Sequence, residues 1–357
     1  MKINNCRLCH SDKINEIINL GSQPLADTFL YEKELFSKGE VYYPLALSLC
    51  DSCKHVFTSH FIPPEKRYQE TEYSYDSSNS SVSIMHFENF SKAVDQKLSL
   101  NSDSRIADIG SNVGTLLLNF IRMGFTDVLG IEPSSNICKI ANANGVKTIN
   151  RFFDNSIENE ITQNGKFDVL LSSNVVNHID DLNSFFDLAN KILNKNGYFV
   201  FEVPYLYDLV KTFAFDTIYH EHVNYFSLFT LKSFLNKKGF NIIDVEFLDY
   251  MCGSIRVYVA KDHIQNENEN LNKLIENEIA SGIFDLKTYK KFMIELISLK
   301  FTTLSDLLKL KLEGNKIIGI GAATKGNTFL NFCSLDNHLI EYITDTSQLK
   351  IGKLTPG

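Results

Sequence analysis

The 357-residue sequence lacks several features that would assign it to common classes of protein. No apolar run approaches the roughly 20 residues that span a bilayer, and the polar start MKINNCRLCH has no signal-peptide apolar core. A basic stripe is also missing, because the net charge of −8 is spread along the chain. We therefore expect a cytoplasmic protein with small molecules as partners, no nucleic acid and no membrane.

A disulfide scaffold is also not indicated, since seven cysteines are few for a chain of this length. Four of them form two C-x2-C knuckles, Cys6 with Cys9 and Cys50 with Cys53. Four thiolates at this spacing can converge tetrahedrally on Zn²⁺, and such a closed site leaves no coordination position for a substrate. The pattern predicts a structural zinc ion; four unrelated reduced cysteines are the alternative. Buried thiols are expected at the remaining positions, Cys138, Cys252 and Cys333.

Residues 104–149 predict a nucleotide-binding βαβ unit. An apolar strand at 106–109 leads into the turn GSNVG, a helix follows from about 115 to 123, and a strand at 128–131 ends in Glu132. Glycines at such a turn let the backbone approach a ligand, and the acidic residue accepts hydrogen bonds from ribose hydroxyls. The G-x3-G spacing suits a dinucleotide pyrophosphate poorly, so S-adenosylmethionine fits better. A turn that binds no ligand is the alternative.

Strands and helices continue to alternate up to residue 206. Strands are expected at 167–172 and within 196–206, with a helix between them. This alternation predicts a parallel sheet covered on both faces, with ligands outside the carboxyl ends of the strands. A chain of 357 residues is longer than one hydrophobic core usually organises, and 44% apolar residues are enough for burial. We therefore expect two or three domains. Four polar residues fall near strand ends, namely Asp108, Glu132, Asn174 and Glu202.

A second strand, turn and helix are expected in NKIIGIGAATKGNTFLNF, residues 315–332, after a helical segment that ends near 313. We expect the strand to be buried. Gly319, Gly321 and the backbone amides near Lys325 and Asn327 can hold an anion such as a pyrophosphate. A turn that only packs a strand on a helix needs no ligand and is the alternative.

The segment FDTIYHEHVNYFS, residues 215–227, sets four polar side chains in apolar and aromatic surroundings: Tyr219, His220, Glu221 and His222. Histidine suits proton transfer near neutral pH. A His-x-His pair can also bind a catalytic metal, although no third protein ligand is identifiable in the sequence. A structural pair that fills an apolar wall is the third interpretation.

The order of these segments resembles the zinc-containing, S-adenosylmethionine-dependent sugar C-methyltransferases, which methylate C3 of a dTDP-4-keto-deoxyhexose. The resemblance covers essentially the whole chain. It includes the paired knuckles and GSQPLADTFL, EYSYDSSNSSVSIMHFENF, DIGSNVGTLL, NVVNHIDDL, FEVPYL, FDTIYHEHVNYFS and GIGAATKGNTFLNF. The resemblance implies an α/β protein with a zinc-binding domain at 1–70 and a Rossmann-like class I methyltransferase domain at 71–260. Residues 261–357 would supply connecting helices and a partial Rossmann-like α/β domain that holds the nucleotide-sugar.

The resemblance also implies roles for single residues. His222 is expected to be the base that forms an enolate, Tyr219 and Glu221 to orient the sugar or relay protons, and Tyr75 to reach the sugar. His220 is expected to support this loop or contact the substrate. Independently of the resemblance, His178 is expected to cap or pack the helix after Asn174. The implied cofactor contacts are Asp108, Gly110, Asn112, Gly114, Glu132, Asn174, Ser78 and Ser81. Nucleotide-sugar contacts are expected at Lys325 and Asn327.

Two departures from the family pattern are visible. Val113 stands where relatives usually carry aspartate, which would lower affinity for the cofactor. The sequence stops at Gly357, where relatives continue, so we expect a truncated C-terminal domain. These departures leave two other hypotheses open, an O- or N-methyltransferase acting on a sugar and a catalytically weakened binding or scaffold protein.

Overall fold

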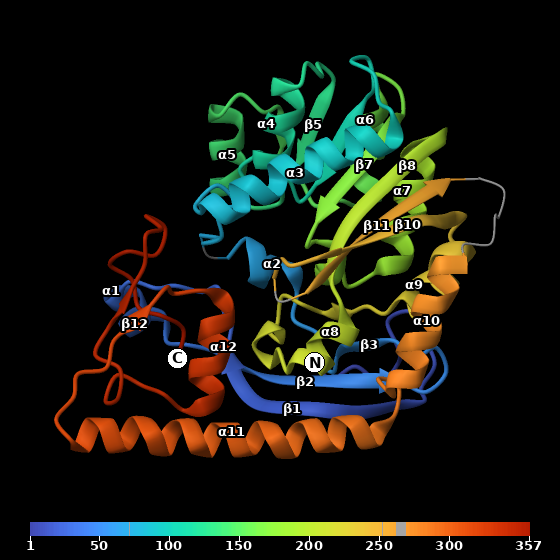
Figure 1. Cartoon of the computed structure of the whole chain (residues 1–357). Coiled ribbons are helices and arrows are strands. Elements are labelled where there is room, and N and C mark those ends of the chain that lie inside the picture. Colours follow the sequence, from blue (N-terminus) through green and yellow to red (C-terminus); the bar gives the residue numbers. More distant parts are fainter. Residues whose placement is uncertain (71, 252, 262–268) are drawn as a thin grey trace.

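The computed structural model describes residues 1–70, 72–251, 253–261 and 269–357, so Cys252 lies outside the described residues. The N-terminal part is an antiparallel sheet (Figure 1), whose strands are β1 (Ile14–Pro24), β2 (Tyr42–Cys50) and β3 (Val56–Thr58). Ile14 at the start of β1 pairs with Cys50 at the end of β2. This register brings the two C-x2-C knuckles to the same end of the β1–β2 pair. Two short helices accompany the sheet, α1 (Glu32–Lys38) and α2 (Pro64–Tyr68).

The fourth strand of this sheet comes from the middle of the chain. Strand β9 (Asn224–Tyr225) pairs with β3 in antiparallel register, with Phe57 opposite Asn224. The polar segment that precedes β9 is therefore tied to the N-terminal sheet. Just before it in the sequence lie helix α8 (Leu206–Thr212) and a short 3₁₀ helix, η3 (Phe215–Thr217).

The central sheet has seven strands in the order β10-β11-β8-β7-β4-β5-β6. The strands are β4 (Ile106–Ile109), β5 (Val128–Ile131), β6 (Thr148–Ile149), β7 (Phe167–Ser173), β8 (Leu193–Pro204), β10 (Phe240–Leu248) and β11 (Ser254–Lys261). β4 to β8 are parallel, as predicted, but β11 is antiparallel to both of its neighbours. The five residues between β10 and β11 are too few for the crossover that parallel strands require.

Alternate strand residues pack against helices on opposite faces of the sheet. On one face Ile106 and Val169 join a cluster with Phe90 of α3 (Ser81–Leu98) and Leu117 of α4 (Thr115–Arg122). On the other, Leu170 belongs to a cluster that includes residues of α6 (Glu158–Thr162), α7 (Leu182–Ile192) and α9 (Leu228–Lys237). This period of two is the expected pattern for a sheet covered on both faces. The other helices of this part are α5 (Ser135–Ala143), η1 (Asn155–Ile157) and η2 (Val176–His178).

The C-terminal part rests on the N-terminal sheet. Helix α10 (Glu269–Ser281) leads into the 27-residue α11 (Leu286–Leu312), which runs along β1 in Figure 1 and supports α12 (Thr324–Cys333). A shared apolar cluster joins β1 and β2 to α8, η3, α11 and α12. None of the helices within the described ranges has the length and apolar character needed to cross a membrane.

The prediction of a buried strand near residue 320 was wrong. Strand β12 (Gly319–Ile320) pairs in parallel with β13 (Ile343–Thr344), and the two form a separate two-stranded sheet. The Ile320 side chain is 87% exposed and Ile318 is 45% exposed, because so small a sheet has no second layer over that face. The helix predicted after the turn is present as α12. Cys138 and Cys333 are buried thiols, as expected.

Candidate active site

A cavity of about 1000 Å³ opens at the carboxyl-terminal ends of β4, β5 and β7. Its wall includes Asp108 of β4, Glu132 after β5 and Asn174 after β7. Because β4 pairs with both β5 and β7, the strand order reverses here, and open α/β sheets bind ligands at such a switch point. Asp27 from the N-terminal part and Lys325 from α12 also line the cavity, so all three parts of the chain contribute to it.

Two positions in the turn between β4 and α4 have a backbone conformation and surroundings that favour glycine. Gly110 has a φ of 71°, and a Cβ at this position would lie 2.3 Å from Cγ2 of Val175. Gly114 has a φ of 84°, and its Cβ would lie 2.7 Å from Cγ2 of Val146. Glycine avoids both the strain of positive φ and the collision. The bare backbone at Gly110 can therefore approach a ligand closely.

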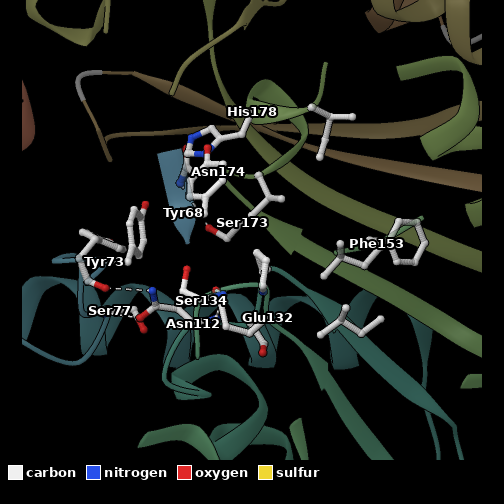
Figure 2. A pocket seen from close by; sticks show the side chains of 18 of the residues that line it. Tyr68, Tyr73, Ser77, Asn112, Glu132, Ser134, Phe153, Ser173, Asn174 and His178 are labelled. Atoms are coloured by element: carbon white, nitrogen blue, oxygen red, sulfur yellow. Dashed lines mark hydrogen bonds between the residues drawn. The ribbon is translucent and has the colours of Figure 1, made fainter. Parts of the chain in front are cut away.

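Glu132 and Asn112 connect this turn to the segment that precedes α3. One carboxylate oxygen of Glu132 accepts the Asn112 amide hydrogen at 3.1 Å, and the other accepts that of Ser134 at 2.7 Å. The Asn112 side chain accepts from the Ser77 amide at 2.9 Å and donates to the Tyr75 carbonyl at 3.0 Å. Figure 2 shows Glu132, Asn112, Ser134 and Ser77 on one side of the cavity and Asn174 across from them.

Several buried polar atoms on the cavity wall have no hydrogen-bond partner in the described part of the chain. They include Asp108 Oδ1, Ser111 Oγ, Ser134 Oγ and Asn174 Oδ1. Burial, together with the charges of Glu132 and Glu202, raises the pKa of Asp108 to about 8. Leaving such groups unpaired is costly, so a polar ligand with a cationic group would stabilise the site. S-adenosylmethionine, which carries ribose hydroxyls and a methionine ammonium group, fits these requirements.

His222 and Tyr219 form a buried pair on the same cavity wall. Nδ1 of His222 lies 2.9 Å from the Thr217 carbonyl oxygen, which can only accept, so Nδ1 carries the hydrogen. Nε2 is then the acceptor for the Tyr219 hydroxyl at 2.5 Å. Burial, and to a lesser degree the nearby imidazole of His178 and the charge of Lys325, hold the pKa of His222 well below its ordinary value. Burial and the charge of Asp27 raise the pKa of Tyr219 well above its ordinary value.

His178 is a cavity residue, although the sequence suggested only a capping or packing role for it. Its ring centroid lies 5.0 Å from that of His222, and Nδ1 lies 2.9 Å from the Tyr68 hydroxyl oxygen. Nε2 is buried and has no partner in the part of the chain that the structure describes. Burial and the charge of Arg67 lower the pKa of His178 to about 3, so its imidazole is neutral. The one hint in the sequence is its position four residues after Asn174.

The structure brings most of the proposed site residues to one place. The described cavity wall contains Tyr75, Asp108, Gly110, Asn112, Glu132, Asn174, Tyr219, His222 and Lys325. It does not contain Gly114, Ser78, Ser81, His220, Glu221 or Asn327, and Val113 is likewise outside it and fully buried. In the serine-rich segment, Ser77 and Ser80 line the cavity instead.

The residues outside the wall have other contacts. Ser78 donates to Asp76 at 2.6 Å, and Nε2 of His220 donates to the Tyr43 carbonyl at 3.2 Å. Asn327 donates to the Ala26 carbonyl at 2.7 Å and so joins α12 to the N-terminal part.

Glu221 is buried just behind the wall. Its Oε2 has no partner among the residues described. Burial and the charge of Asp27 raise the pKa of this carboxyl to about 8.

The four knuckle cysteines form the predicted metal site. All four sulfur atoms lie within 4.8 Å of one another, with Cys6 3.5 Å from Cys53 and Cys9 3.6 Å from Cys50. Zn–S bonds of about 2.3 Å in a tetrahedron place the sulfurs about 3.8 Å apart, so the cluster fits zinc. These cysteines would hold the metal and supply no open coordination position, which is the chemistry of a structural site.

Family models match three consecutive stretches of the chain. Residues 6–68 match the family described as "Putative zinc binding domain", residues 86–245 match "Methyltransferase domain", and residues 249–357 match "C-methyltransferase C-terminal domain". Together with the sheet order and the cavity, these matches define an S-adenosylmethionine-dependent methyltransferase with a structural zinc site.

One relative matches over nearly the whole chain. It is the C-methyltransferase NovU of Streptomyces niveus, 30% identical over 357 residues, which are 99% of this chain and 84% of the relative. A ubiquinone biosynthesis O-methyltransferase of Azorhizobium caulinodans is 31% identical, but over only 33% of this chain and 47% of its own length. The chain belongs to the family of zinc-type, S-adenosylmethionine-dependent C-methyltransferases.

Solved structures give weaker likenesses. Magnesium protoporphyrin IX methyltransferase from Synechocystis PCC 6803 is 12% identical, covers 52% of this chain and 90% of its own, and has a TM-score of 0.40. A methyltransferase from Clostridium acetobutylicum is 17% identical, covers 50% and 92%, and has a TM-score of 0.41. These scores are too low to support any functional inference.

Proposed function

We propose that the protein transfers a methyl group from S-adenosylmethionine to the carbon beside the ketone, C3, of a nucleotide-linked 4-keto-deoxyhexose. The observation that supports this most is the His222–Tyr219 pair, a neutral imidazole and a phenol on the same wall as the cofactor turn. A carbon next to a ketone becomes a nucleophile only after its proton is removed, so carbon methylation requires a base, which methylation of an existing lone pair does not.

The pair can move this proton by a relay. Because Nε2 of His222 already accepts the Tyr219 hydrogen, the phenol oxygen takes the substrate proton as its own passes to the imidazole. The electron pair of the broken C–H bond moves into the enolate. The Thr217 carbonyl holds the imidazole in the tautomer that leaves Nε2 free to accept. The low pKa of His222 keeps it unprotonated across the neutral range.

His178 is suited to stabilise the enolate oxygen. In the tautomer in which the Tyr68 hydroxyl donates to Nδ1, the imidazole carries its hydrogen on Nε2, the atom without a partner among the described residues. A donor already in place near a developing oxyanion lowers the barrier to enolisation. The sulfonium cofactor supplies an electrophilic methyl group; a C–C bond then forms as the S–CH₃ bond breaks. Tyr75 and Lys325 line the same wall and would contact the sugar and its diphosphate.

Incubation with methyl-labelled S-adenosylmethionine and a panel of nucleotide-linked 4-keto-6-deoxysugars tests the proposal. NMR of the product should place the label on carbon C3. Without cofactor, the protein should still exchange the C3 hydrogen of an accepted sugar with deuterium from D₂O. A label found on oxygen or nitrogen, or methyl transfer without any exchange competence, would contradict the proposal.

A further inference from the structure

We propose that Arg7, inside the first zinc knuckle, and His55, just after the second, are positioning residues that fix the segment 178–180 and with it the imidazole of His178. The role of His178 in turnover rests on the proposed function; the positioning of its segment does not. The metal site then does more than stabilise the N-terminal sheet, because both knuckles reach the wall of the active-site cavity through a buried side chain.

The first connection is a cluster of charges in which two buried arginines share one partly exposed carboxylate. Arg7 lies between Cys6 and Cys9 and donates from Nη1 to Asp180 Oδ1 at 2.6 Å. Arg67 pairs with the other oxygen of Asp180 and donates from Nη1 to the His178 carbonyl at 3.2 Å. The two arginine side chains are 5% and 0% exposed, and that of Asp180 is 20% exposed. Removal of Asp180 would leave two buried arginines without their carboxylate, so the ion pairs favour the observed position of Asp180.

The second connection starts at the other knuckle. His55, two residues after Cys53, is fully buried, and its Nε2 lies 3.0 Å from the Asn224 side-chain oxygen. That oxygen can only accept, so His55 donates. Asn224 in turn donates from Nδ2 to the Ile179 carbonyl at 2.7 Å. The chain of hydrogen bonds therefore ends on the residue between His178 and Asp180.

The two connections constrain the same three residues from opposite knuckles. Arg7 holds the side chain of Asp180, Arg67 holds the backbone at His178, and His55 acts through Asn224 on Ile179. Asn224 also lies two residues after His222, so its side chain links the segment that carries His222 to the segment that carries His178. Zinc would fix the direction in which the knuckle side chains leave, because the four sulfurs lie within 4.8 Å of one another.

Hydrogen exchange in the purified full-length protein tests the inference without any substrate. The amides of His178 and Ile179 donate to the carbonyls of Val175 and Val176, so their exchange reports on this segment. Arg7→Gln should keep one zinc per chain, yet exchange of these two amides should become about tenfold faster. Arg7→Lys should restore part of the protection. Asp51→Asn, inside the second knuckle but exposed, is the matched control and should leave the segment unchanged.

Steady-state kinetics provides a second test. With a sugar that the wild type accepts, Arg7→Gln should lower kcat roughly 10- to 100-fold and change KM little, because misplacement of a catalytic group acts on the transition state. Asp180→Asn removes the same ion pair from outside the knuckle and should reproduce the effect if Arg7→Gln does not fold. Unchanged exchange at residues 178–179 in a zinc-bearing Arg7→Gln or Asp180→Asn protein would overturn the inference. Absence of C3 exchange in the wild type would instead contradict the proposed function.

Discussion

The Nε2 atom of His222 lies 2.5 Å from the hydroxyl oxygen of Tyr219, so the imidazole accepts the phenolic hydrogen. Because both groups are buried and neither ionises readily alone, we expect them to act as one unit. His222→Asn and Tyr219→Phe should each lower kcat by about 10²- to 10⁴-fold, and the double variant should be little worse than either single variant. Single-turnover rates with labelled cofactor measure this.

The control for this pair is His338→Asn, the same change at an exposed histidine of the C-terminal part, which should leave the rate unchanged. Binding of adenosylhomocysteine should be the same within about twofold in all variants, since the pair does not contact the cofactor turn. Additive losses in the double variant would show that the two residues act separately.

Zinc should be present at one ion per chain in metal analysis of the purified protein. Cys9→Ser removes one of the four sulfurs, so zinc content should fall well below one and the free energy of unfolding should drop by roughly 3 kcal/mol or more. Cys333→Ser changes a buried thiol far from the cluster and should keep the full zinc content. Equal zinc loss in both variants would contradict the assignment.

Gly110→Ala should weaken cofactor binding and destabilise the fold. The new Cβ would meet Val175 at 2.3 Å and would occupy a positive φ. Gly124→Ala is matched for positive φ but has open space around it, so it should cost only about 1 kcal/mol from strain. Denaturant unfolding and calorimetric binding of adenosylhomocysteine separate the two effects. Combining Gly110→Ala with Val175→Ala should recover part of the loss; no recovery would show that backbone strain alone is responsible.

Cofactor binding should release a proton near pH 7. Burial and two neighbouring carboxylates raise the pKa of Asp108 to about 8 in the free protein, so the carboxyl is largely protonated at pH 7. A bound ammonium group favours the carboxylate and lowers this pKa, which expels the proton at any pH between the free and bound values. The binding enthalpy should therefore vary with the ionisation enthalpy of the buffer at pH 7. In Asp108→Asn this variation should disappear. A buffer-independent enthalpy in the wild type would contradict the prediction.

The sequence predicted the parts of the structure that are encoded by local patterns. Strands β4 and β5 begin and end at the predicted residues, because their apolar runs are bounded by a glycine turn and by Glu132. The tetrahedral cysteine cluster was also predictable, since spacing within each knuckle defines its ligands. The glycine at position 110 was predictable from the turn motif because its positive φ is a local backbone requirement, whereas its close approach to Val175 was not.

Features that depend on contacts between distant segments were not predictable in this way. Ile320 follows the pattern of a buried strand, yet it is exposed because its strand, β12, pairs only with β13 in a two-stranded sheet. The sequence next to His178 is typical of a packed helix. Its place in the site depends on contacts with Tyr68 and His222, which lie far from it in the sequence.

The pairing of β9 with β3 limits how this protein could have been assembled from simpler modules. Residues 224–225 belong by sequence to the methyltransferase unit but complete a sheet of the N-terminal unit. A chimera that joins the N-terminal 70 residues of one family member to the core of another would leave this ladder mismatched. Recombination within the family should therefore preserve both partners together, and excision of the core alone would expose an edge where β9 had been anchored.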